Sequence, residues 1–295
     1  MYVIDKSRAV YFMDKGNAPA LSVPSGSTVV FETADCFSDQ IKSEDHKIDG
    51  IDWNKINPAT GPLYVEGAEP GDVLAVSIEE IEIDEKGIVM VAKDLGVLGS
   101  ILTENAIKIV PIKEGVAHFS DTIHIPVEKM IGVIGVAPAG EAITNGAPDY
   151  HGGNMDCKEI REGAKLFLPV SVPGGLLALG DLHGAMADGE VGGSGLELCG
   201  KVTLTVEVIK KHDAADMPTP MILNDTHIMT LHSDVSLDVA VDTAVGKMAD
   251  YLVKTKGFTL ARASMLLSLA GQAKICQVVD PKKTARVELA RDLLQ

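Results

Sequence analysis

The chain has 295 residues, of which 46% are hydrophobic and 4% aromatic, and its formal net charge at pH 7 is −16. This length allows one large domain or two to three smaller ones, with a core filled mainly by aliphatic side chains. The negative charge would repel phosphate backbones, and few aromatic side chains are available to stack on bases, so we expect no nucleic acid partner.

The N-terminal region and the cysteines indicate the compartment. Residues 1–8 carry charges where a secretory signal needs an apolar stretch. The longest apolar stretch, 130–137, is far shorter than the roughly 20 residues of a membrane-spanning helix. The four cysteines lie far apart and form no C-x-x-C pair, which suits a reducing compartment. We therefore predict a cytoplasmic protein with no membrane partner.

Short apolar runs separated by Gly, Pro and Asp predict β-strands over the first two-thirds of the chain. The clearest runs are 28–32, 73–78, 87–91 and 202–209, and the last of these alternates apolar residues with Thr and Glu. The spacing is typical of a jelly-roll-like sandwich or barrel. We place a β-rich N-terminal domain at 1–145, a β-rich domain with the main site motifs at 146–225, and an α+β domain at 226–295.

The C-terminal third has a helical period. From Ser236 the apolar residues recur every three to four positions, and Gly257 follows the last of them. A second helix is expected over about 259–269, with Thr259 as its N-cap and Gly271 at its end. Residues 275–279 and 285–289 read as strands joined at 280–283. The fold class is therefore mainly β, with two C-terminal helices packed on strands.

The densest group of chemically active residues lies between positions 181 and 197. It contains Asp181, His183, Asp188, Glu190 and Glu197 among several glycines. On an extended segment Asp181 and His183 point to one side, as do Asp188 and Glu190, so each pair can hold one ion. The alternative is that Asp188-Gly189 and Gly192-Gly193 form hairpin turns with solvated carboxylates.

Two distant segments offer further groups. Asp35 follows a predicted strand, and His46 is the best distant candidate ligand, although it can equally be a solvated loop histidine. In 151–156, Gly152 and Gly153 allow the backbone to approach a ligand, and Asn154 can donate and accept hydrogen bonds. The same segment can also be a plain turn.

A thiol nucleophile is the main alternative to a metal site. Cys36 is next to Asp35, and His46 could act as its base. Buried cysteines are usually inert, however, and nothing in the sequence indicates a lowered thiol pKa. Ser194 lacks the sequence context of a nucleophile elbow, and the chain has no phosphate-binding loop, H-E-x-x-H motif or dinucleotide fingerprint.

Several motifs, taken in order, resemble the acetamidase/formamidase family over nearly the whole chain. They are the segments 57–72, 134–138, 152–156, 168–170 and 180–183, followed by 188–190 and Glu197. The resemblance implies a β-rich fold with a jelly-roll-like part, an α+β C-terminal part, and hydrolysis of formamide, acetamide or similar amides. The chain departs from the family's pattern at Leu182, Gly184, Met186 and Ala187, and Leu182 and Met186 would make the pocket more apolar. Cys157 is a further individual feature.

We hypothesise a divalent ion held by Asp181 and His183, which would lower the pKa of bound water toward about 7. Zinc is preferred, with manganese or calcium as alternatives. The remaining ligands would come from three residues, Asp35, His46 and Asp156.

The other roles follow from this hypothesis. Glu190, with Asp188 beside it, would be the general base. Asn154, or an N–H near Gly152 and Gly153, would hold the oxyanion, and His151 would line the substrate site together with these glycines. The expected partners are a small amide substrate and a second copy of the chain in a homodimer. The remaining alternative is a scaffold that binds cations or amides without turnover.

Overall fold

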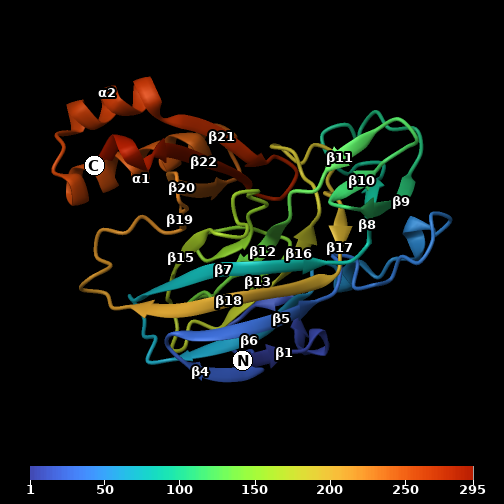
Figure 1. The fold of residues 1–295 in the computed structure, drawn as a ribbon, viewed down its shortest axis with the longest axis horizontal. Coiled ribbons are helices and arrows are strands. Elements are labelled where there is room, and N and C mark those ends of the chain that lie inside the picture. The colour runs from blue at the N-terminus through green and yellow to red at the C-terminus, as the bar shows by residue number, and fades with distance from the viewer. Residues whose placement is uncertain (295) are drawn as a thin grey trace.

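The computed structural model describes residues 1–294, which form two large β-sheets and a pair of helices near the C-terminus (Figure 1). The first sheet has the strand order β1 (Tyr2–Ile4), β5 (Ser27–Thr33), β18 (Gly200–Ile209), β7 (Val73–Ile83), β15 (Lys165–Pro169), β19 (Met221–Leu223), β20 (His227–Asp234), β22 (Lys283–Ala290) and β21 (Gln272–Gln277). This sheet runs from the N-terminal strand to the C-terminal hairpin.

The second sheet carries the strands on which the candidate site is built. Its order is β11 (His124–Pro126), β10 (Val116–His118), β9 (Ala106–Lys113), β8 (Lys86–Val91), β17 (Glu197–Leu198), β16 (Leu177–His183), β12 (Met130–Gly135) and β14 (Gly152–Asn154). Strand β6 (Ala59–Glu66) also pairs with β16, and β2 (Ala9–Val10) and β4 (Leu21–Pro24) pair with β6. A separate two-stranded sheet consists of β3 (Phe12–Met13) and β13 (Ile143–Thr144).

The main core lies between the two sheets and is aliphatic, as the composition predicts. On β18, Val202, Leu204 and Val206 are fully buried, while the intervening threonines are partly exposed. Alternate burial of this kind is typical of a strand with one face on the core. In contrast, every residue of β12 and β16 is buried. Charged groups on these two strands are therefore shielded from water.

Two helices cover the C-terminal end of the first sheet. Helix α1 (Leu237–Lys256) begins at Ser236, whose side chain caps Val239 N–H, and ends at Gly257, which has the left-handed conformation (φ 67°). Helix α2 (Leu260–Ala270) begins after its N-cap Thr259. These boundaries match the predicted helices, because the capping residues are local signals. The predicted fold class is confirmed, although neither sheet closes into a barrel within residues 1–294.

The predicted domain boundaries near 145 and 225 stay predictions. Strands from both sides of the first boundary share both sheets, and β19 and β20 continue the first sheet across the second. Short 3-10 helices complete the described chain: η1 (Lys6–Arg8), η2 (Ile48–Gly50), η3 (Trp53–Lys55) and η4 (Arg291–Leu294). Neither described helix has both the length and the apolar character needed to cross a membrane.

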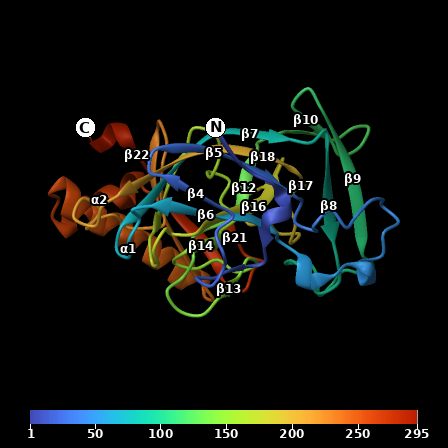
Figure 2. The same cartoon turned by 90° about the horizontal axis from the view of Figure 1, so that it is seen from below.

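The candidate site lies between the two ends of the molecule. Strands β8–β11 lie at the end opposite to α1 and α2, and β12, β16 and β17 lie between them (Figures 1 and 2). The C-terminal strand β21 reaches back toward this central region, where Gly189 forms an isolated bridge with Gln277.

Candidate active site

Two buried carboxylates meet at Gly132, in the middle of β12. Asp156 follows β14 and Asp181 lies in β16, the two strands that pair with β12 on either side. A Cβ atom at position 132 would lie 2.5 Å from a carboxylate oxygen of Asp156 and 2.5 Å from one of Asp181. Glycine at this position therefore makes room for both carboxylates.

Three acidic residues of the site have a left-handed backbone conformation. The φ angles are 42° at Asp156, 56° at Asp181 and 47° at Glu190. Residues other than glycine rarely adopt this backbone conformation, because it costs on the order of 1 kcal/mol or more per residue. Such residues are concentrated at functional sites. The surrounding fold must hold these residues in place.

His183 is the centre of the carboxylate group. Its Nε2 atom lies 3.1 Å from Glu197 Oε2, 3.5 Å from Asp181 Oδ1 and 3.9 Å from Asp156 Oδ1. Glu197 stands opposite His183 in the β16–β17 register and accepts a hydrogen bond of 2.7 Å from Gly195 N–H. A Cβ atom at Gly195 would lie 2.7 Å from His183 Nδ1, so this glycine covers the imidazole ring. We call Asp156, Asp181, His183, Glu190 and Glu197 the acid cluster.

Burial sets the protonation of the acid cluster, whose members are at most 9% exposed. Burial, with the charges of neighbouring acids, raises the pKa of Asp156 and of Glu190 well above the usual carboxyl range. Burial raises the pKa of Glu197 to about 7, although His183 opposes the shift. Burial alone would lower the pKa of His183, but the Glu197 and Asp181 carboxylates outweigh it and hold that pKa well above its usual value.

Several buried atoms of the acid cluster lack a hydrogen-bond partner. These atoms are both carboxylate oxygens of Asp156, both ring nitrogens of His183, and Glu197 Oε2. The 3.1 Å approach of His183 to Glu197 does not have hydrogen-bond geometry. Buried polar atoms without partners are costly and indicate a ligand, a water or an ion.

The donor atoms of the acid cluster fit a divalent cation. One set of atoms, from Asp156, His183 and Glu190, lies within 4.8 Å of one another, and a second set comes from Cys36, Asp181 and Glu197. A mixture of imidazole and carboxylate donors around one point is typical of zinc or manganese sites. An ion here would also compensate the charge of several buried carboxylates.

Glu190 belongs to the acid cluster, whereas Asp188 is bound by Arg286. Positive φ angles at Gly189 (99°) and Glu190 (47°) reverse the chain between them. The predicted same-side pair is therefore wrong, because the segment is a turn and not extended. Arg286 binds both oxygens of Asp188, with Nη1–Oδ1 and Nη2–Oδ2 distances of 2.9 and 3.1 Å. The catalytic part assigned to Asp188 stays a prediction, and the geometry shows it as an anchor of the turn that presents Glu190.

Asp280 joins the site although the sequence reasoning missed it. Its Oδ2 atom accepts a hydrogen bond of 2.9 Å from Asn154 Nδ2, 126 positions away. Burial, together with Asp156 and Asp181, raises the pKa of Asp280 well above its usual range. The buried side chain of Gln277 accepts hydrogen bonds from Val279 N–H and Asp280 N–H. The sequence showed only a turn at 280–283, because no local pattern reveals so distant a partner.

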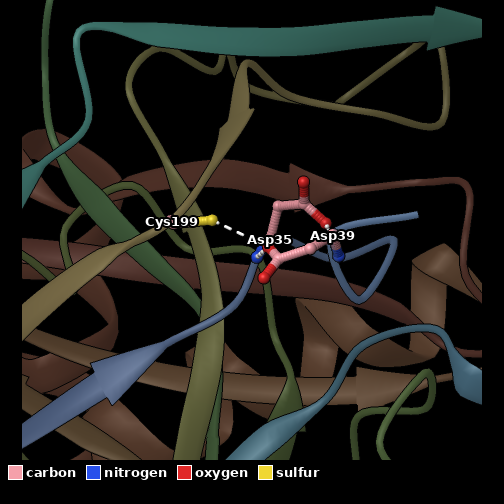
Figure 3. A group of neighbouring side chains, drawn as sticks. All are labelled: Asp35, Asp39 and Cys199. Atoms are coloured by element: carbon pink, nitrogen blue, oxygen red, sulfur yellow. Dashed lines mark hydrogen bonds between the residues drawn. The ribbon is translucent and has the colours of Figure 1, made fainter. Parts of the chain in front are cut away.

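The predicted ligands Asp35 and His46 are not grouped with Asp181 and His183. Asp35 forms a separate group with Asp39 and Cys199 (Figure 3). Asp35 Oδ1 accepts a hydrogen bond of 2.8 Å from Asp39 N–H, and Cys199 Sγ lies 2.9 Å from Asp39 Oδ1. Left-handed φ angles at residues 38 and 39 fold this loop back on Asp35. His46 belongs to none of the three groups found among residues 1–294, so both ligand assignments stay predictions.

The 151–154 segment packs mainly against the protein's own chain. His151 is fully buried, neither of its ring nitrogens has a partner, and burial lowers its pKa to about 4. Gly152 N–H donates to Asp149 O, and a Cβ atom at Gly153 would lie 2.5 Å from the carbonyl oxygen of residue 147. Asn154 Oδ1 is buried without a partner. The substrate-binding roles of His151, Gly152 and Gly153 stay predictions.

An apolar cavity of about 230 Å³ adjoins the acid cluster, and Glu190 and Gly195 are part of its lining. Met186, which the sequence analysis linked to a more apolar pocket, also lines it. Leu182 is instead fully buried in the main core. Of these two departures from the family pattern, the structure connects Met186 to the cavity.

Comparisons with known proteins place this architecture in a family. The sequence profile of the "Acetamidase/Formamidase family" matches residues 16–146 and 139–294. The crystal structure of an acetamidase from Bacillus halodurans is 46% identical, with a TM-score of 0.96 over 99% of this chain and 98% of that one. A structure described as a predicted acetamidase/formamidase from Thermoanaerobacter tengcongensis is 47% identical, with a TM-score of 0.95 over 99% of this chain and 96% of that one.

The match with a curated relative covers only part of each chain. A candidate formamidase from Schizosaccharomyces pombe is 31% identical over 274 residues, and the match covers 69% of this chain and 65% of the relative. The chain therefore spans less than two-thirds of the length of that relative.

Proposed function

The chain belongs to the acetamidase/formamidase family, and on this premise we propose that it hydrolyses small aliphatic amides to ammonia and a carboxylate. In this reaction the C–N bond breaks, the oxygen of water forms the new C–O bond, and a proton passes to the leaving nitrogen. The observation that carries the proposal is the convergence of three buried carboxylates on His183, with Glu190 as a fourth within 4.8 Å, beside an apolar cavity. Such a site can activate water and bind an aliphatic group side by side.

Glu190 is the proposed general base. It belongs to the acid cluster and also lines the cavity, so it can reach a water molecule next to a bound amide. Burial raises the pKa of Glu190 well above the usual carboxyl range. A carboxylate with a raised pKa can take a proton from water and return it to the leaving nitrogen near neutral pH.

Asp156, Asp181, His183 and Glu197 are the proposed holders of a divalent cation. When bound, the cation supplies positive charge that polarises the amide carbonyl and makes a neighbouring water more acidic. We propose zinc, with manganese or calcium as alternatives, because an imidazole donor favours zinc over calcium. The buried atoms without partners on Asp156, His183 and Glu197 support this assignment.

Asn154 is the proposed donor to the oxyanion. Its Nδ2 atom already donates one hydrogen bond to Asp280 and carries a second hydrogen. The hydrogen bond to Asp280 orients the side-chain amide of Asn154, so its second N–H has a fixed direction. A donor aimed at the oxygen that gains negative charge in the transition state is a strong source of rate enhancement.

A thiol nucleophile at Cys36 is the rival mechanism. The Cys36 Sγ atom lies within 4.8 Å of ligand atoms of Asp181 and Glu197. Burial, together with the Glu197 and Asp181 charges, raises the pKa of the Cys36 thiol well above its usual value. The reactive thiolate is thus disfavoured, which supports activated water as the nucleophile.

Ammonia release from formamide and acetamide tests the proposal. The purified full chain is freed of metal with a chelator, assayed, and reloaded with single ions. We expect activity to disappear and to return with zinc or manganese. Full activity in the metal-free sample would contradict the role of the cation. Inactivation of the wild type by a thiol-alkylating reagent, together with loss of activity in Cys36→Ser, would favour the thiol mechanism. Thermal stabilisation by amides without ammonia release would indicate a binding scaffold.

We also propose that the enzyme is a cytoplasmic homodimer. All four cysteines, Cys36, Cys157, Cys199 and Cys276, are free thiols in the structure, which suits a reducing compartment. Light scattering of the purified protein measures the oligomeric state, and a monomer at micromolar concentration would contradict the dimer.

A further inference from the structure

The apolar cavity beside Glu190 has walls unlike those of the acid cluster. Strands β8 to β11 contribute Val89, Val110, Ala117 and Ile125 to its lining, and the loop that follows β16 contributes most of the rest. Glu190 and Ser194 supply the polar side chains among the lining residues, and the rest is mostly aliphatic. The apolar part of the lining includes Val89, Val110, Phe119, Ala185, Met186 and Leu196.

The cavity adjoins the acid cluster at Glu190 and Gly195. Glu190 belongs to both, since the residue lines the cavity and one of its carboxylate oxygens lies within 4.8 Å of ligand atoms of His183 and Asp156. Gly195 also lines the cavity, and it separates the cavity from the His183 ring with backbone atoms alone. An amide whose carbonyl lies at the acid cluster would therefore have its acyl chain in the cavity.

The mouth of the cavity is apolar as well. Phe119 and Ile125 line it and are 37% and 39% exposed, and Val191, also in the lining, is 56% exposed. Exposed apolar groups around an opening are typical of a site that binds an apolar ligand. A substrate with a hydrocarbon chain would cover them as it enters.

We propose that the cavity is an acyl-chain pocket and that the enzyme prefers aliphatic amides with acyl chains of roughly four to six carbons to formamide and acetamide. This inference rests on the amide hydrolysis proposed above. A cavity of about 10–15 Å³ already holds one water molecule, so 230 Å³ is far more than the methyl group of acetamide fills. Formamide and acetamide would leave most of the apolar wall uncovered.

Chain length should therefore raise the specificity constant. Each methylene group that enters the cavity is expected to raise kcat/KM about three- to fourfold, until the cavity is full. The gain depends on contacts with the lining side chains, so a smaller cavity should remove it and a larger one should shift the optimum to longer chains.

The experiment measures kcat/KM for formamide, acetamide, propionamide, butyramide and hexanamide by ammonia release. Wild type is compared with Ala185→Leu, which fills the cavity, and with Met186→Ala, which enlarges it. The matched controls are Ala215→Leu in an exposed loop and Met265→Ala, whose side chain is 62% exposed on α2. The quantity compared is the ratio of kcat/KM for hexanamide to that for acetamide.

We expect this ratio to be well above one in wild type, to fall at least about tenfold in Ala185→Leu, and to be retained in both controls. Met186→Ala should move the optimum to a longer chain, which keeps the inference testable if Ala185→Leu does not fold. Turnover of acetamide with a ratio of one or less in wild type would overturn the acyl-chain pocket and leave amide hydrolysis intact. Absence of turnover with every amide would overturn the proposed function and this inference together.

Discussion

Replacement of Arg286 by methionine should destabilise the protein and weaken the site at once. The Arg286 side chain is fully buried, and it donates to both oxygens of Asp188, to Glu288 Oε1 at 2.7 Å and to the carbonyl of Ile275 at 3.0 Å. Methionine keeps much of the volume but leaves these acceptors without their donor. Loss of one partner from a buried ion pair costs roughly 3–5 kcal/mol.

This cost is reduced by the remaining cations. Glu288 keeps Lys274 at 2.7 Å, and Asp188 keeps Lys158 at 3.5 Å and is partly exposed. We therefore expect the lower part of that range, about 3 kcal/mol, which corresponds to a fall in Tm of roughly 6–12 °C. The anchor of the turn that presents Glu190 is also lost, so kcat/KM for acetamide should fall about tenfold or more.

Differential scanning calorimetry and ammonia release measure the two effects in the same preparations. Arg286→Lys should be intermediate, because one ammonium group cannot bind both Asp188 oxygens as the planar guanidinium does. The exposed Arg8, changed to methionine, is the control for loss of one positive charge. If Arg286→Met melts within about 2 °C of wild type and keeps its activity, the reasoning about this anchor is refuted.

Three further predictions follow from other parts of the site. Gly132→Ala should lower kcat/KM about a hundredfold, because its Cβ would meet two carboxylates at 2.5 Å; Gly146→Ala, with nothing within 4 Å, is the control and should keep full activity. Burial lowers the pKa of His151 to about 4, so the folded state resists a proton that the unfolded state binds below pH 6.5. The free energy of unfolding should therefore fall by about 2 kcal/mol between pH 6.5 and pH 5 because of His151. Urea unfolding of His151→Phe should lack this pH-dependent loss, and the same pH dependence in the variant and the wild type would contradict the role given to His151. Gln277→Leu should lower the free energy of unfolding by about 1–3 kcal/mol, because it leaves buried backbone groups of the following turn unpaired. Exposed Gln272→Leu on the same strand should have little effect, and equal losses in the two variants would argue against the role of Gln277.

The elements of the fold that could be predicted are those with local signals. The strand at 202–209 was recognisable because its apolar residues alternate, and the strand buries them on one face. The helix after Ser236 was recognisable because a serine cap and a terminal glycine bracket a helical period. Such features depend on neighbours a few positions away, and this is the range over which a sequence pattern carries information.

The site could be predicted only in part. Asp181 and His183 stood out because they lie two positions apart in one extended segment, where alternation predicts both side chains on one face. The left-handed φ of Asp181 (56°) was not predictable from this pattern. The direction of the Glu190 side chain could not be predicted, because a positive φ at a residue other than glycine depends on tertiary contacts. Asp280 was also missed, since its hydrogen bond to Asn154 is made only when the C-terminal strands reach the central sheet.

The C-terminal part supports the site through three contacts. Arg286 anchors Asp188, Gly189 exchanges backbone hydrogen bonds with Cys276 O and Val278 N–H, and Asp280 contacts Asn154. Each contact joins residues about 90 or more positions apart, so none can form before the C-terminal strands have packed. The left-handed conformation of Glu190 is unfavourable by itself and needs this support. The proposed general base, Glu190, therefore depends for its position on the packing of the C-terminal strands against the turn at 187–190.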